Sequence, residues 1–430
     1  MRPEVSARKL GPAAILAFAV ACGGGDDGGE GQGGADGGAG EARTVEVTTW
    51  LGSFQKPPLF AAAQDGDGAW EVLDGPDGVH SFEVTSGRYG FLFYCDEARR
   101  YAFFSTVDEG QQVDRGCEGR YSESPTVHVA VEGLMEGEYA WVGLGRNWSG
   151  MARPGSPAAL FPPPGIHDLV IALAEANGAA SAILVERDVE VREGEDLDLT
   201  FDAADAVDAT AYPVALDGYL HLTDVRVHLA TADGSLGLVG LDSFNATTED
   251  DLMYGAYPDA DPTDLYRIWI GDSGESGQPA EYRFISDPQD LAITAPDDFT
   301  LTEASAAATT PSVRLQTTFA VRAGATYSLF FKQTAPPYYS MDVYLSGGWL
   351  AGQAGTFTWQ QPDFAGLGGW DPAWAFGAGV EVGVSAVEMV GDLDPLIVLP
   401  QFPPDRKVPF PADLAGKAVT LAPTTATFVP

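Results

Sequence analysis

Positive charge is scarce in this sequence. The 430 residues include 23 lysines and arginines against 62 acidic residues, which gives a formal net charge of −39. A field of that sign repels nucleic acid and anionic lipid head groups, because both carry dense negative charge. Nucleic-acid binding is therefore excluded as a function class. Divalent cations or basic partners would be attracted, although high solubility or adaptation to a salty medium accounts for the same charge without any ligand.

Long hydrophobic runs are also absent. A transmembrane helix requires about 18 or more consecutive apolar residues, and no stretch of this chain reaches that length. The longest candidate, Leu10–Ala21, is about half the required length and follows the basic residues Arg2, Arg8 and Lys9. A basic segment followed by a short apolar run is typical of a secretory signal peptide, which we place at residues 1–21.

The apolar run ends in Ala19-Val20-Ala21-Cys22. This tetrapeptide resembles the lipobox of bacterial lipoproteins, although Ala19 replaces the leucine favoured at that position. The resemblance implies cleavage before Cys22, diacylglycerol on its thiol and attachment to a lipid bilayer through the acyl chains. Gly23 stands where some lipoproteins have an inner-membrane retention aspartate, so the analogy favours the outer membrane. The alternative is an ordinary secretory signal with an unmodified cysteine.

A glycine-rich segment follows the lipobox. The twenty residues 23–42 contain eleven glycines and five acidic residues, with no large apolar side chain. Such a composition cannot form a core, so residues 22–43 are predicted to be a flexible linker after the lipidated cysteine. A chain of that length spans an r.m.s. distance of about 25 Å, a suitable separation between an anchor and a folded body.

Cysteine is rare as well, with three residues in the whole chain. Once Cys22 is assigned to lipid, Cys95 and Cys117 remain as an even pair in an exported protein, where a disulfide is expected. In the chain-entropy model, closing that loop stabilises the fold by about 3 kcal/mol.

The body shows alternation of apolar and polar residues with a period of two, which predicts β-strands. Residues 313–321 and 326–332 flank a short turn and predict a β-hairpin. Asp168–Ala174 and Ala182–Glu186 predict a second hairpin around Asn177-Gly178, with a short helix capped by Asp168 as the alternative. The continuous apolar stretch in Arg88–Cys95 predicts a strand buried on both faces.

Turn residues recur every 8 to 12 positions without a long amphipathic helix, so we predict an all-β protein of three to four tandem β-sandwich modules after the linker. We place a disulfide-containing module at 44–122, further modules at 123–205 and 206–305, and a tryptophan-rich module at 306–430. The second module faintly resembles carboxypeptidase-regulatory or transthyretin-like modules through Thr126–Gly133 and Pro163-Pro164-Gly165. The resemblance implies a β-sandwich and transfers no functional residue.

Two motifs superficially resemble hydrolase signatures. Gly271-Asp272-Ser273-Gly274 matches residues around the nucleophile of trypsin-like proteases, but Glu275 replaces the next glycine, and no histidine has the expected context. Ser53-Phe54-Gln55-Lys56 fits the S-x-x-K of penicillin-binding enzymes, but two prolines follow at once and the companion motifs are missing. We predict no assembled catalytic site and no cofactor.

The segment containing Asp259, Asp261 and Asp264 is similar to a calcium-binding loop. It lacks the EF-hand glycine, and Ile270 occupies the position of the bidentate glutamate. A solvated acidic turn is the expected structure, and a calcium loop of another type is the alternative.

Aromatic residues are concentrated near the C-terminus. We expect Trp349 and Trp359, in strand-like sequence, to be core residues. Trp370 and Trp374 lie among glycines and a proline, so they are candidates for a flat platform that binds sugar rings. The favoured function is a non-enzymatic cell-envelope lipoprotein acting as a structural or interaction scaffold for an unidentified protein or glycan. A carbohydrate-binding lipoprotein and an envelope hydrolase are the alternatives.

Overall fold

The computed structural model describes residues 19–20, 41–51, 54–55, 57–117, 125–145, 149–175, 178–219, 223–244, 252–271, 280–310, 312–353, 355–393 and 414–430. β-strands dominate these ranges, so the predicted all-β class is confirmed. Their helical segments are the two short 3-10 helices η1 (Ala203–Asp205) and η2 (Pro372–Trp374). Within the described ranges, no helix has the length and hydropathy needed to cross a bilayer. Cys22 and nearly all of the predicted linker lie outside these ranges.

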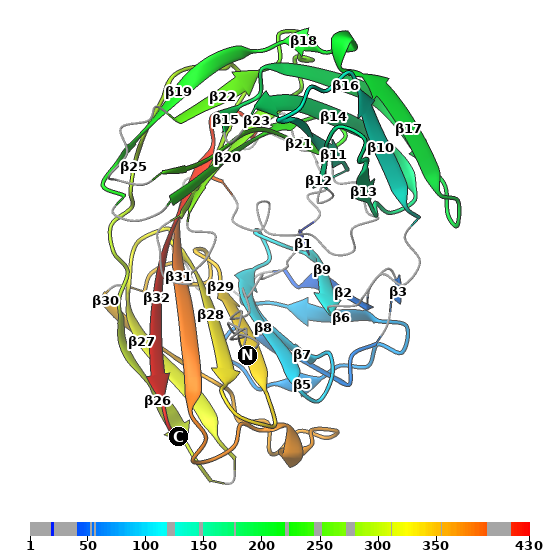
Figure 1. Cartoon of the computed structure of the whole chain (residues 1–430). Helices are drawn as coiled ribbons and strands as arrows, with labels where there is room; N and C mark the ends of the chain where they lie inside the picture. Colours follow the sequence, from blue (N-terminus) through cyan, green and yellow to red (C-terminus); the bar gives the residue numbers. More distant parts are fainter. Residues whose placement is uncertain are drawn as a thin grey trace, which may run out of the picture.

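One sheet of 13 strands runs through the molecule and connects its two halves (Figure 1). In sheet order the strands are β15 (Gly178–Ala179), β21 (Leu236–Phe244), β20 (Thr223–Ala230), β23 (Leu265–Gly271), β24 (Ala280–Ile285), β32 (Ala418–Phe428), β31 (Val382–Gly391), β28 (Thr326–Gln333), β29 (Ser340–Leu345), β8 (Arg99–Thr106), β7 (Arg88–Tyr94), β4 (Phe60–Asp65) and β5 (Glu71–Val72). Neighbours are antiparallel except β29 and β8, which pair in parallel.

Five smaller sheets cover this large sheet or extend the structure beyond it. The lower half in Figure 1 contains one sheet of β1 (Ala19–Val20), β9 (Gln112–Cys117), β2 (Arg43–Leu51), β3 (Phe54–Gln55) and β6 (Val79–Val84), and another of β26 (Leu301–Ala308), β27 (Arg314–Val321) and β30 (Gly355–Gln360). The upper half contains β13 (Ala158–Leu160), β10 (Val127–Glu132) and β17 (Leu197–Asp202); β12 (Ser149–Ala152), β11 (Glu138–Leu144), β14 (Gly165–Glu175), β16 (Ala182–Val191) and β18 (Val207–Asp208); and β22 (Leu252–Ala256), β19 (Thr210–Asp217) and β25 (Leu291–Thr294).

Four buried clusters lie between these sheets. In the lower half the large sheet is a central layer, because one cluster joins it to β2, β6 and β9 and another joins its opposite face to β26, β27 and β30. In the upper half a third cluster joins it to β19, β22 and β25, with side chains from β11 and β14. The fourth lies within the segment β10–β17. Strand β7, buried from Tyr89 to Tyr94, supplies both lower clusters, as its continuous apolar sequence predicts.

The module boundaries predicted at residues 122, 205 and 305 do not coincide with boundaries between sheets, because strands from different predicted modules pair with each other. Strand β8 of the first predicted module pairs with β29 of the last, and β24 of the third pairs with the C-terminal β32. The second and third segments also share a core. Alternation of apolar residues shows that a strand has a buried face, but it does not show which strand lies beside it.

One predicted hairpin is confirmed and the other is wrong. Strands β14 and β16 pair antiparallel, with Leu173 opposite Ala182, so the segment after Asp168 is a strand rather than a helix. Strands β27 and β28 belong to different sheets: β27 pairs with β26 and β30, and β28 with β29 and β31. The chain crosses the core at this turn, and the rings of Phe319 and Tyr327 face each other with centroids 4.6 Å apart.

Two glycines allow close contact between the second and third segments. A Cβ atom on Gly143 of β11 would lie 2.0 Å from the carbonyl oxygen of Leu236, and one on Gly237 of β21 would lie 2.1 Å from Val170. Real Cβ atoms do not approach other atoms so closely, so any side chain at either position would force β11 and β14 away from β21.

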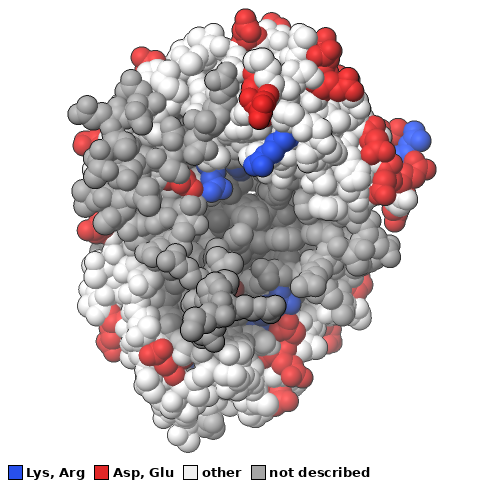
Figure 2. Space-filling model, viewed as in Figure 1, with Lys and Arg blue, Asp and Glu red and all other residues white. Residues whose placement is uncertain are grey.

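Acidic side chains are spread over the described part of the face shown in Figure 2, and lysine and arginine side chains are few on it. The negative charge therefore covers the surface broadly on this face. This distribution accounts for solubility without requiring one specific ligand.

Candidate functional site

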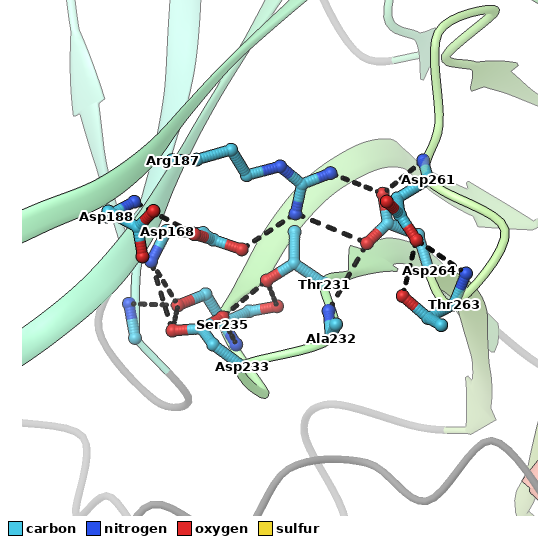
Figure 3. Close-up of polar contacts among 11 residues, drawn as sticks. Asp168, Arg187, Asp188, Thr231, Ala232, Asp233, Ser235, Asp261, Thr263 and Asp264 are labelled. Atoms are coloured by element: carbon cyan, nitrogen blue, oxygen red, sulfur yellow. Dashed lines mark hydrogen bonds and ion pairs between the residues drawn. The ribbon is translucent and has the colours of Figure 1, made fainter.

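The densest polar cluster surrounds Arg187 (Figure 3). The guanidinium donates from Nη1 to Oδ2 of Asp168 at 2.7 Å, and from Nη2 to Oδ2 of Asp264 at 2.6 Å. A second bond from Nη1 to Oδ1 of Asp264, at 3.2 Å, makes that contact bidentate. Both carboxylates are buried, with side-chain exposures of 8% for Asp168 and 0% for Asp264.

A bulge between β14 and β16 places these groups. The register shifts between His167 and Leu169, where Arg187 and Asp188 of β16 lie opposite the single residue Asp168 of β14, so the extra residue is on β16. On β16, Asp188 has a φ of 57°, a left-handed value unusual for a residue other than glycine, and its N–H donates to Oδ1 of Asp168. The bulge thereby directs Arg187 toward the loop that precedes β23.

The turn between β20 and β21 completes the cluster. Asp233 accepts hydrogen bonds from the side chains of Thr231 and Ser235 and from the backbone N–H of Asp168. Burial alone would raise the pKa of Asp233, but these hydrogen bonds outweigh it and lower that pKa. Burial alone would lower the pKa of Arg187, but the hydrogen bonds of its guanidinium to Asp264 and Asp168 outweigh burial and raise that pKa. Both groups therefore stay ionised at neutral pH.

The cluster also involves two of the three predicted calcium-binding residues, Asp259, Asp261 and Asp264. The carboxylate of Asp264 is occupied by Arg187 and by the backbone N–H groups of Ala232 and Asp261. Asp261 accepts from the backbone and side chain of Thr263, and Asp259 is exposed. Among the described residues, no group of three or more His, Cys, Asp or Glu side chains could hold a metal ion. The three aspartates thus form a turn around a buried ion pair, and calcium coordination by them as a set is not supported.

The predicted platform tryptophans pack against the second buried cluster. The ring of Trp374 lies 5.2 Å from that of Tyr94, and Nε1 of Trp370 donates to the Tyr94 hydroxyl at 3.3 Å. Both rings are partly buried. Trp359 is a core residue with 2% exposure, as expected, whereas Trp349 is only partly buried and packs on Phe104. The surface that Trp370 and Trp374 offer to a sugar ring is correspondingly reduced.

Arg100 of β8 is a feature that the sequence does not reveal. It is fully buried, and its guanidinium carbon lies 5.5, 4.7 and 4.5 Å from the ring centroids of Tyr94, Tyr339 and Phe376. Among the described residues its three nitrogens have no hydrogen-bond partner. Burial lowers the pKa of Arg100 to about 10, so it remains charged at neutral pH and is held by cation–π contacts. Arg100 therefore fixes Tyr94 beneath the Trp370–Trp374 loop.

A cavity of about 440 Å³ opens beside that loop. Its described walls come from the segment 57–61, from 72–76 and from Gly368-Gly369, and His80 of β6 also contacts it. Most of the side chains in these walls are apolar, polar atoms supply nearly half of the accessible wall surface, and Asp74 is the one carboxylate among them. These walls include no serine, cysteine or lysine, so they provide no nucleophile of the usual kinds and favour binding over covalent chemistry.

Of the three cysteines predicted to be modified, Cys22 lies outside the described residues. Cys95 follows β7 and is partly buried against the first cluster, while nothing is described of the Cys117 side chain beyond its place at the end of β9. The disulfide therefore stays a prediction, as does lipidation of Cys22. No protein-family model matches the chain, and no curated protein matches it.

Proposed function

We propose that this chain is an exported lipoprotein, attached to the cell envelope through acyl chains on Cys22, whose β body is a non-catalytic interaction scaffold. The Arg187 cluster is the observation that supports a non-catalytic role. It is the assembly of charged groups that most resembles an active site, yet Asp168 and Asp264 are buried in ion pairs with Arg187. Groups held in this way stabilise the fold and are not available to a substrate.

The hydrolase alternative has one supporting feature, the buried carboxyl group of Glu281 on β24. Burial raises the pKa of Glu281, as a general acid requires. However, Arg283 lies 2.7 Å from this carboxylate, and Glu281 is only 3% exposed. A substrate would have to displace the arginine and open the sheet, so a structural ion pair is the better interpretation.

Fractionation of the expressing bacterium tests the anchor. We expect Cys22→Ser to move the protein from the detergent phase to the aqueous phase, because only the Cys22 thiol can accept diacylglycerol in the lipobox interpretation. The matched control is the double variant Cys95→Ser/Cys117→Ser, which should stay in the detergent phase. Retention of Cys22→Ser with the membranes would overturn the anchored part of the proposal.

Activity screening tests the scaffold part. We expect no turnover with peptide, ester or glycoside substrates. Robust hydrolysis that is abolished by Glu281→Gln would replace the scaffold with the hydrolase.

A further inference from the structure

The cavity beside the Trp370 loop combines two features that a structural void lacks. Leu59 and Val72 line the cavity, and 54% and 44% of their surface is exposed. Few other large apolar side chains in the described structure are exposed. Exposed apolar groups gathered around a concavity are typical of a binding site. The volume of about 440 Å³ lies within the range of pockets for small molecules.

The second feature is His80. It is 2% exposed, it contacts the cavity, and neither of its ring nitrogens has a hydrogen-bond partner among the described residues. Leaving a buried polar group without a hydrogen bond is unfavourable, because the group has lost its bonds to water, so such a group in a native protein calls for an explanation. Burial lowers the pKa of His80, opposed by the charge of Asp77, so the ring favours the neutral form, which has one nitrogen that accepts a hydrogen bond.

Gly75, in the turn at 74–76, packs against this ring. A Cβ atom on Gly75 would lie 2.4 Å from Nδ1 and Cε1 of His80, so only a glycine fits against that edge of the imidazole. A small outward shift of the turn would uncover the nitrogen to a molecule in the cavity. Asp74, the one charged group among the described walls, belongs to the same turn and is exposed.

We propose that this cavity binds a small organic cation with an apolar body, such as an arylalkyl amine. The apolar body packs between Leu59, Phe60 and Val72. The ammonium group lies near Asp74 and donates a hydrogen bond to His80. An anion is disfavoured, because it would meet Asp74 and the field of a chain with a net charge of −39. The site is independent of the anchor and of the scaffold function.

Three probes of similar size distinguish the ligand classes in the complete protein. Calorimetry and saturation-transfer NMR are run with phenethylamine, 2-phenylethanol and 3-phenylpropionate. We expect phenethylamine to bind with a Kd of about 1 mM or tighter. It should bind about 3-fold more tightly than the neutral alcohol, as one partly exposed ion pair allows, and the carboxylate should bind most weakly. Asp74→Asn should remove the preference for the amine over the alcohol.

Two tryptophan variants locate the site. Val72→Trp places a large ring at the cavity and should reduce phenethylamine binding at least about 10-fold by occupying the apolar volume. Ile166→Trp is the matched control, because Ile166 is equally exposed at 46% and does not line this cavity, and it should bind as the parent does. The imidazole NMR signal assigned by its loss in His80→Phe should shift on titration with the amine.

The proposal is overturned if phenethylamine does not bind, if the carboxylate binds as well as the amine, or if Val72→Trp binds like Ile166→Trp. An unchanged His80 signal at saturation would remove His80 from the site.

Discussion

Replacing Arg187 with methionine removes the positive charge that two buried carboxylates share. Asp264 has no exposed side-chain surface and Asp168 has 8%, so neither can be solvated by water after the change. Breaking a buried ion pair in this way costs about 3–5 kcal/mol, because an uncompensated charge remains in the interior. We therefore expect Arg187→Met to lower the free energy of unfolding by that amount. The loss should centre on the strands that the cluster joins, β14, β16 and β23.

Arg192→Met is the matched control for this substitution. Arg192 lies on the surface near the end of β16 and pairs with Glu190 at 2.9 Å, with exposures of 64% and 59%. An exposed pair of this kind contributes little to stability, because water and salt screen the attraction, so Arg192→Met should leave the free energy of unfolding nearly unchanged. Arg187→Lys keeps the charge but loses the bidentate contact, so its effect should fall between the two.

Urea unfolding gives the free energies, and amide hydrogen exchange locates the loss. A cost below about 1 kcal/mol for Arg187→Met, or one equal to that of Arg192→Met, would refute the interpretation of the cluster as a structural lock.

Three further outcomes are expected. Trp359→Ala should lower the free energy of unfolding by about 3–5 kcal/mol, measured by urea titration, because it leaves a cavity in a core where the ring is 2% exposed. Alkylation under denaturing, non-reducing conditions should label neither Cys95 nor Cys117 in protein isolated from the envelope, and mass spectrometry that finds both labelled would contradict the disulfide. Burial would raise the pKa of Asp65, but hydrogen bonds from the turn at 85–86 lower it to about 2. Because this folded-state pKa lies below the unfolded value near 3.8, its stabilisation of about 1 kcal/mol, after allowance for solvent screening, is present above pH 4 and disappears toward pH 2. Asp65→Asn should therefore destabilise at pH 7, and its effect should shrink as the pH falls through 2, as followed by thermal unfolding.

The sequence predicts the strands better than their partners. A continuous apolar run predicts β7 correctly, and two strand-like segments around Asn177-Gly178 predict the β14–β16 hairpin. Elsewhere, a period of two shows which residues of a strand point inward. The same period fits a hairpin and a chain that crosses between two facing sheets. For β27 and β28 the alternation is satisfied by contact of Phe319 with Tyr327 through the core, which no local pattern distinguishes from pairing side by side.

The polar and aromatic sites depend on contacts between distant parts of the chain. Asp264 is 77 residues from Arg187, and its acidic neighbours in the sequence predicted a solvated turn, with a calcium loop as the alternative, rather than a buried ion pair. Arg100 is surrounded by rings at positions 94, 339 and 376, of which only the first is close in sequence. His80 packs against Gly75 and lines a cavity whose walls come from three separate segments, a position that no local pattern reveals.

The position of β32 in the large sheet has a consequence for the order of folding. This strand, Ala418–Phe428, lies between β24 and β31, so the sheet stays divided into two parts until residues near 428 are available. Strands β8, β7, β4 and β5 lie early in the chain, but they join the large sheet only through the parallel pairing of β8 with β29, which is synthesised more than 200 residues later. Contacts between residues so distant in sequence form late and slowly. The central sheet can therefore be completed only after almost all of the chain has been synthesised, whereas the segment β10–β17 contains its own buried cluster and does not depend on β32.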